Sequence, residues 1–149
     1  MTPSSGDPFN LQRFVDAQAS NYAEALAELN AGRKETHWMW YVFPQIAGLG
    51  GGGGFATLYA IGSKDEARAY LRHPVLGARL LECCIATLKH HRTPAIDIFG
   101  SIDAMKLRSC ATLFAQVSPP GSVFEQIIER FYDGAPDRKT LDLLQRLKF

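Results

Sequence analysis

Capping residues and helix breakers divide this chain into short segments whose apolar residues recur at helical spacing. Residues 63–66 (SKDE) and 122–125 (SVFE) match the capping box, in which a serine and a glutamate each close a free amide at a helix start. Pro94 and the pair at residues 119–120 end two further segments. Apolar and polar residues alternate only from Phe55 to Ile61. We therefore predict an all-α fold, a compact single-domain bundle of about seven or eight short helices, with at most one short strand-like segment from Phe55 to Ile61.

Several helix limits can be predicted from single residues. The apolar spacing predicts a helix from Leu11, a bend near residues 20–21 and a second helix that stops at Gly32. Glycine suits the position just past a helix end because it adopts left-handed backbone angles without strain. Asp103 and Asp137 are expected to cap two later helices with their carboxylates.

Length, charge and cysteine content restrict the class of protein. In a chain of 149 residues we expect a disordered tail at residues 1–7 and a single all-α domain at residues 8–149. The net charge of +1 gives no indication of nucleic-acid binding. The sequence has no signal-peptide pattern and no apolar run of the roughly 18 residues that a membrane span needs. Its three cysteines are an odd number, which argues against a disulfide framework. We expect a cytoplasmic protein that binds neither nucleic acid nor membrane.

The most distinctive segment is HWMWYVFPQ at residues 37–45, which contains both tryptophans of the chain. A helix from Thr36 to Phe43 would carry aromatic side chains on every face, so it would be buried all round or would line a pocket. In the first interpretation, which is narrowly favoured, the aromatic residues are core. In the second interpretation the segment lines a pocket. Trp38 or Trp40 would offer a stacking face, His37 a titratable group, and Arg33 or Lys34 a contact for an anion.

A second candidate group follows Asp103. Lys106 and Ser109 are three residues apart and share a helix face. This face is either solvated, or it points into the cleft that holds His37 or Trp38 and acts as an anion clamp.

Two other features do not indicate a site. The glycine run GLGGGGG at residues 48–54 lacks the lysine and the hydroxyl residue of a phosphate-binding loop, so we expect a flexible surface loop. Cys83 and His90 are seven residues apart, as are Cys84 and His91, which is too far for one metal within a helix. We expect neither a metal nor a cofactor.

The chain resembles a small bacterial and fungal family labelled domain of unknown function 1810, sometimes called calpastatin-like. The resemblance runs from about Asp7 to the C-terminus, and its segments include DPFNLQRF (7–14), HWMWYVFPQ (37–45), HPVLG (73–77) and IFG (98–100). It implies a compact all-α domain and no established activity. Members usually carry a polar, serine-containing segment where this chain has glycine at residues 51–54. A more general similarity, without a continuous motif, is to small helical domains that act on ADP-ribose derivatives and related N-glycosides.

Three functions are compatible with these residues. The leading hypothesis is a pocket for a small anionic or nucleotide-like molecule. The residues expected to form it are Lys34, His37, Trp38, Trp40, Gln45, Asp103, Lys106 and Ser109. The second is a hydrolase of an ADP-ribose-type or N-glycosidic substrate, with Asp103 or Glu35 as general base or cation stabiliser and Lys106 on phosphate. The third is a protein-interaction module without a small-molecule site.

Overall fold

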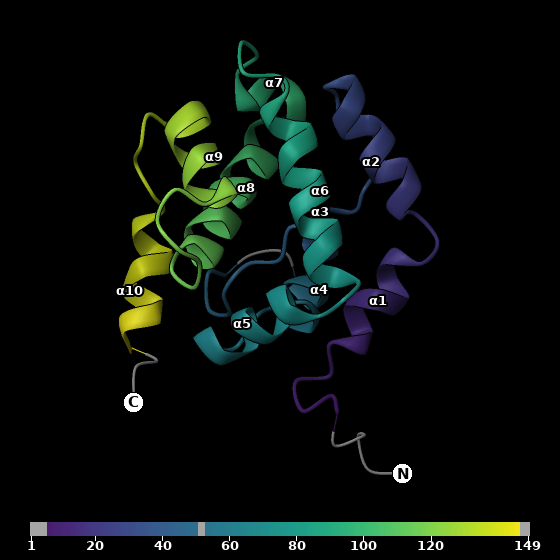
Figure 1. Cartoon of the computed structure of the whole chain (residues 1–149), viewed down its shortest axis with the longest axis vertical. Helices are drawn as coiled ribbons and strands as arrows, with labels where there is room; N and C mark the ends of the chain where they lie inside the picture. The colour runs from purple at the N-terminus through teal and green to yellow at the C-terminus, as the bar shows by residue number, and fades with distance from the viewer. Residues whose placement is uncertain (1–5, 51–52, 147–149) are drawn as a thin grey trace.

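The part of the chain that the structure describes is an assembly of helices, as the helical spacing predicts (Figure 1). The computed structural model describes residues 6–50 and 53–146. These residues form ten helices: α1 (Gln12–Gln18), α2 (Tyr22–Ala31), α3 (Met39–Val42), α4 (Gly53–Leu58), α5 (Lys64–Arg72), α6 (Leu76–Leu88), α7 (Ala95–Phe99), α8 (Ser101–Ala115), α9 (Val123–Tyr132) and α10 (Arg138–Arg146). The predicted number of seven or eight is too low because α3, α4 and α7 span only four to six residues each. Such short helices leave almost no periodic signal in a sequence.

The segment from Phe55 to Ile61 is not a strand, although its alternation of apolar and polar residues allows one. Its first residues belong to α4, and only Ile61 pairs as a strand would, in an isolated parallel bridge with Ile46. The amide of Ile61 donates to the carbonyl of Gln45 at 2.8 Å, and the amide of Ala47 donates to the carbonyl of Ile61 at 2.8 Å. Apolar alternation over so few residues does not distinguish a strand from a short helix.

The starts of α5 and α9 and the end of α2 follow the predicted capping chemistry, with one change at the glutamates. The hydroxyls of Ser63 and Ser122 accept from the backbone amides three residues later, which opens α5 and α9. The glutamates reach one residue further back than a standard capping box, so Glu66 accepts from the amide of Gly62 at 2.9 Å. Gly32 ends α2 with a φ of +79°.

Two aspartates bind backbone amides at the starts of the first and last helices. Asp137 accepts from the amide of Thr140 at 3.1 Å, as predicted for the start of α10. Asp7 accepts from the amides of Leu11 and Gln12 at 2.6 and 3.1 Å and so caps α1. Residues 1–5 of the expected tail lie outside the described residues.

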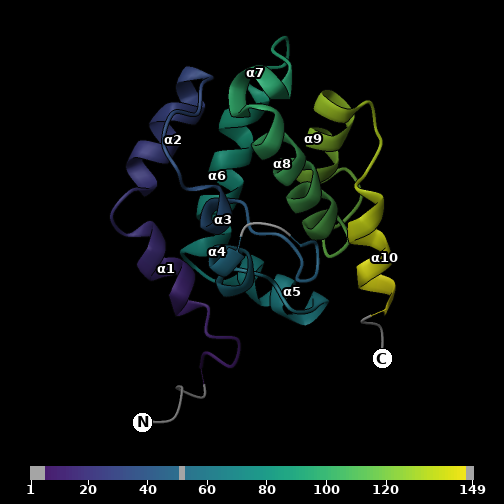
Figure 2. The ribbon, with the colours of Figure 1, turned by 180° about the vertical axis from the view of Figure 1, so that it is seen from behind.

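The core lies around α6 and α8, against which α2, α3, α5, α7, α9 and α10 pack (Figure 1). Seen from behind, α3 and α4 lie in front of α6, between α1 and α8 (Figure 2). Cys83, Cys84 and Cys110 are buried here as free thiols, and burial raises the pKa of Cys83 to about 12. Among the described residues there is no helix both long enough and apolar enough to cross a bilayer.

The side chain of Arg13 connects α1 to α5 and to the C-terminal end of α4. Its guanidinium forms an ion pair with Glu66 of α5 at 2.8 Å. It also donates to the carbonyls of Leu58 and Ala60 at 2.7 and 2.8 Å, where α4 ends. α4 exposes most of its side chains, so these bonds hold in place a helix that contributes little to the core.

Candidate functional site

The segment that leads from α2 to α3 is not helical, and the carboxylate of Glu28 organises it. Glu28 Oε1 accepts from the backbone amides of Glu35 and Thr36 and from the indole N–H of Trp38, at 2.7, 3.0 and 3.0 Å. Its Oε2 accepts from the hydroxyl of Thr36 at 2.6 Å. The predicted helix from Thr36 to Phe43 is therefore wrong in its first part, and only Met39–Val42 is helical.

These bonds also change the acidity of Glu28. Burial alone would raise the pKa of this carboxyl, but the hydrogen bonds from Thr36, Glu35 and Trp38 lower it to about 2. Glu28 is 8% exposed, so it remains a buried anion whose charge is stabilised by these donors.

The two tryptophans have different environments, and each of the two interpretations of HWMWYVFPQ applies to one of them. Trp38 is 1% exposed and its indole N–H is bound to Glu28, so it is a core residue. Trp40 is half-buried, and among the described residues no hydrogen bond involves its indole N–H. Only Trp40 therefore presents an accessible aromatic edge with an unused donor.

Lys34, Asp103 and Lys106 form a charged cluster beside these rings. Lys34 Nζ lies 2.9 Å from Asp103 Oδ2, and Lys106 Nζ lies 3.0 Å from Asp103 Oδ1. Lys34 Nζ lies 4.9 Å from the centre of the Trp38 ring, and Lys106 Nζ lies 4.0 Å from that of Trp40. Both ammonium groups thus stack on aromatic faces, and two cations share one carboxylate.

Asp103 has a different role from the predicted one. Helix α8 starts at Ser101 after Gly100, so Asp103 lies inside the first turn and does not cap the helix. Its partial burial would raise the pKa of its carboxyl, but the hydrogen bonds from Lys34 and Lys106 outweigh burial and lower it. Asp103 is thus ionised at neutral pH, and the cluster carries a net charge of +1.

Two cavities meet at Lys106 and Trp40. The first, of about 470 Å³, is lined by Lys34, His37, Trp38, Met39, Trp40, Tyr41, Phe55, Asp103 and Lys106. The second, of about 520 Å³, is lined by Trp40, Gln45, Leu49, Gly50, Ile102, Met105, Lys106, Ser109, Asp137 and Lys139. Each of the eight residues expected to form the pocket lines one or both cavities. Lys106 and Ser109 share a helix face and both line the second cavity, where Ser109 Oγ donates to Asp137 at 3.2 Å, and only Lys106 also lines the first cavity.

A smaller cavity of about 280 Å³ adjoins the second one. It shares Trp40, Gln45, Leu49 and Gly50 with that cavity and continues along α4 to Ala60. Glycines 48 and 50 border it with φ of +97° and +83°, backbone angles that a side chain would strain. Gly53 and Gly54 belong to α4 and residues 51–52 lie outside the described residues, so the predicted surface loop is described only at residues 48–50.

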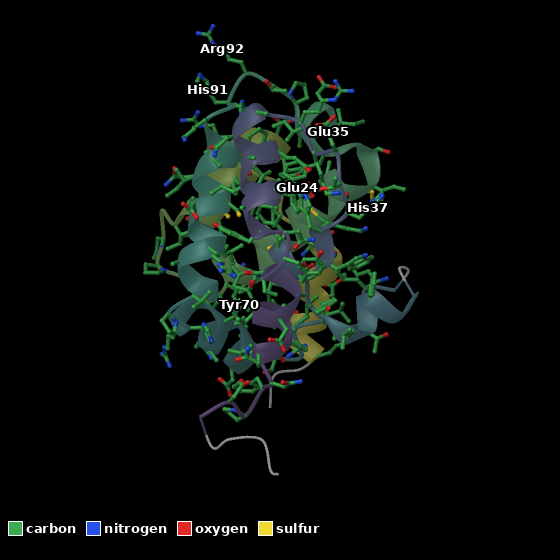
Figure 3. The ribbon with its side chains drawn as sticks, turned by 90° about the vertical axis from the view of Figure 1, so that its right-hand side faces the viewer. Glu24, Glu35, His37, Tyr70, His91 and Arg92 are labelled. Carbon is green, nitrogen blue, oxygen red and sulfur yellow. The ribbon has the colours of Figure 1, made fainter. Side chains whose placement is uncertain are left out.

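Sequence reasoning missed several lining residues. Phe55, Ile102 and Met105 are 58%, 70% and 70% exposed, although they are large apolar side chains. An exposed apolar side chain beside a cavity is typical of a binding surface, but its exposure cannot be read from the sequence. Glu35 is exposed and does not line either cavity, and it lies on the same side of the molecule as His37 (Figure 3).

The side chains of Cys83, Cys84, His90 and His91 do not meet at a common site. His91 is exposed at the turn after α6, away from His37 (Figure 3), whereas Cys83 and Cys84 are buried inside. His90 Nε2 contacts the carbonyl of Leu29 at 2.8 Å. Within residues 6–50 and 53–146, no group of three His, Cys, Asp or Glu side chains is placed to hold a metal ion.

The fold and these cavities define a small all-α domain whose lysine- and tryptophan-lined cavities lie where α3, α4 and α8 meet. The chain belongs to the family described as "Protein of unknown function (DUF1810)", whose sequence profile matches residues 8–144. It is similar to the conserved hypothetical protein Rv1873 from Mycobacterium tuberculosis, known from a crystal structure, with 45% identity and a TM-score of 0.90. That similarity covers 93% of this chain and 99% of the other. No curated protein matches the chain.

Proposed function

We propose that this protein binds a small anionic, nucleotide-like molecule in the cavity formed by Lys34, His37, Trp40, Asp103 and Lys106. The observation that carries the proposal is that two lysines converge on one carboxylate in the cavity wall, at 2.9 and 3.0 Å. The side chains of Lys34 and Lys106 are only 7% and 19% exposed. Their surplus positive charge is thus poorly solvated, which favours an anion as the third partner.

Unused polar groups around the cluster support a ligand with ring atoms. Within the described residues, no hydrogen bond involves the imidazole of His37, the indole N–H of Trp40 or the side-chain amide of Gln45. His37 and Trp40 line the first cavity beside the aromatic rings of Tyr41 and Phe55, and Gln45 lines the second cavity with Trp40. Ligand pockets typically combine such apolar walls with a few polar groups that fix orientation.

Hydrolysis has less support than binding. Asp103 has both carboxylate oxygens occupied by lysines and a lowered pKa, so it is a weak proton acceptor. Glu35, the other candidate base, lines neither cavity. The three free cysteines support a reducing, cytoplasmic setting for a binding protein.

Titration with AMP or ADP-ribose is expected to change the intrinsic fluorescence, because Trp40 lines both cavities and Trp38 is buried. Replacing Trp40 by phenylalanine should abolish most of this change while the ligand-induced rise in melting temperature persists.

Lys106→Met should weaken binding roughly tenfold to a hundredfold, the typical effect of losing a hydrogen bond to a charged group.

Lys89→Met provides the matched control, since it removes the same charge from the exposed end of α6 and should leave affinity unchanged. Ligand at about 100 times Kd should raise the free energy of unfolding by about 2.7 kcal/mol. If neither probe alters the fluorescence or the melting temperature at millimolar concentration, the proposal is wrong and the interaction-module hypothesis takes its place.

A further inference from the structure

We propose that the natural ligand has two arms, namely two flat ring systems joined by an anionic linker, as in a dinucleotide. This inference rests on the proposed function and specifies its ligand class. It follows from the arrangement of the two cavities, which have Lys106 and Trp40 in common. A cation at the boundary between two cavities would contact the middle of a ligand that occupies both.

The charged cluster is suited to the linker. Lys106 Nζ lies over the Trp40 ring at 4.0 Å and borders both cavities. Asp103 holds Lys106 and Lys34 through its two oxygens, so the two ammonium groups lie close together. A diphosphate carries its charges on neighbouring phosphoryl groups, and a pair of close cations complements it better than a single lysine would.

The first cavity is suited to an aromatic arm. His37, Tyr41 and Phe55 line it beside Trp40, and Phe55 is 58% exposed. Stacking on such rings holds a base of any kind, because every base has a π-face. The unused imidazole of His37 can bind a polar edge of that base.

The second cavity is suited to an uncharged arm of similar size. Its apolar wall includes Ile102 and Met105, both 70% exposed, and Gln45 offers an amide that can donate and accept. Its charges are already engaged, since Asp137 accepts from Ser109 at 3.2 Å and Lys139 donates to the carbonyl of Leu49 at 3.0 Å. With volumes of about 470 and 520 Å³, each cavity is large enough for one ring system with its sugar.

The test compares AMP, which has one arm, with diadenosine diphosphate, which has two arms and a similar charge. Calorimetric titration should show that diadenosine diphosphate binds roughly tenfold to a hundredfold more tightly, because its second base is buried against the apolar wall of the second cavity. Equal affinities for the two probes would overturn the two-armed ligand while leaving the proposed function intact. Binding of neither probe would instead overturn the proposed function.

Two variants assign the arms to the cavities. Phe55→Ala changes only the first cavity and Met105→Ala only the second, and both side chains are mostly exposed, so neither change should disturb folding. Each variant should weaken diadenosine diphosphate binding several-fold, and the double variant should bring it to the affinity of AMP. AMP binding should respond to one variant at most. If only one variant weakens diadenosine diphosphate, the second arm lies outside the cavities and the inference is wrong.

Discussion

Replacing Gly77 by alanine is expected to destabilise the protein by at least about 3 kcal/mol, the upper part of the range for overpacking. Gly77 lies in the first turn of α6, where the chain has just left α5. A Cβ atom there would meet the carbonyl oxygen of Leu71 at 2.1 Å and the carbonyl carbon at 2.9 Å. Both are backbone atoms of α5, so the clash can be relieved only by moving one helix away from the other.

Thermal unfolding followed by circular dichroism would measure this effect, with an expected fall in melting temperature of roughly 10 °C. Gly54→Ala is the matched control, since a Cβ at Gly54 in α4 meets nothing within 4 Å. It should be neutral or stabilise the protein by about 0.5–1 kcal/mol, the usual gain of alanine over glycine in a helix. Equal stability of the two variants would contradict a close helix contact at Gly77.

Replacing Glu28 by glutamine is expected to cost about 3 kcal/mol at neutral pH. The carboxylate accepts four hydrogen bonds, from Glu35, Thr36 twice and Trp38. The amide of glutamine has one acceptor oxygen in place of two, and its NH₂ group would face donors. The expected size also follows from the pKa, which is about 2 in the folded protein against an ordinary 4.5.

The lowered pKa of Glu28 also predicts that the free energy of unfolding depends on pH. Because the pKa of Glu28 is lowered on folding, the unfolded chain binds a proton more readily than the folded protein does. The stabilising contribution of Glu28 is therefore complete above pH 4.5 and is lost as the pH falls toward about 2. Urea denaturation at pH 7 and pH 3 should show a smaller loss of stability between the two for Glu28→Gln than for the natural protein.

Glu24→Gln is the control, because Glu24 lies one turn earlier on α2 and, among the described residues, its carboxylate contacts only the hydroxyl of Thr36, at 3.1 Å, which lies closer to Glu28. It should leave both the stability and its pH dependence nearly unchanged. Glu28→Gln should also weaken AMP binding, since the segment that Glu28 holds carries Lys34 and His37. If Glu28→Gln matches the natural protein in stability at both pH values, the segment is held by other contacts.

The parts of the fold that depend on nearby residues could be predicted from the sequence. Ser63 and Ser122 cap their helices through amides three residues away, and Gly32 ends α2 by its own conformational freedom. Such interactions involve only neighbours in the chain, so their residue patterns are sufficient. The family resemblance implied the same all-α domain and no activity.

The candidate site could be predicted only as a set of residues. Nothing local indicates that Glu28 would unwind the expected helix start at Thr36, or that Asp103 would bind Lys34 in place of capping α8. The difference between Trp38 and Trp40 also depends on packing, because two residues of the same type have the same intrinsic preferences. Contacts between distant segments decided these points, and a single sequence does not record them.

Because all three thiols are buried, their rate of chemical labelling reports how often the core opens. Cys83 and Cys84 lie in α6 and Cys110 lies in α8, the two helices at the centre of the core. A thiol reagent in solution can reach them only when these helices separate from their neighbours, so the labelling rate measures how often the core opens. Ligands that bind beside α8 should slow the labelling of Cys110, without any dye or engineered probe.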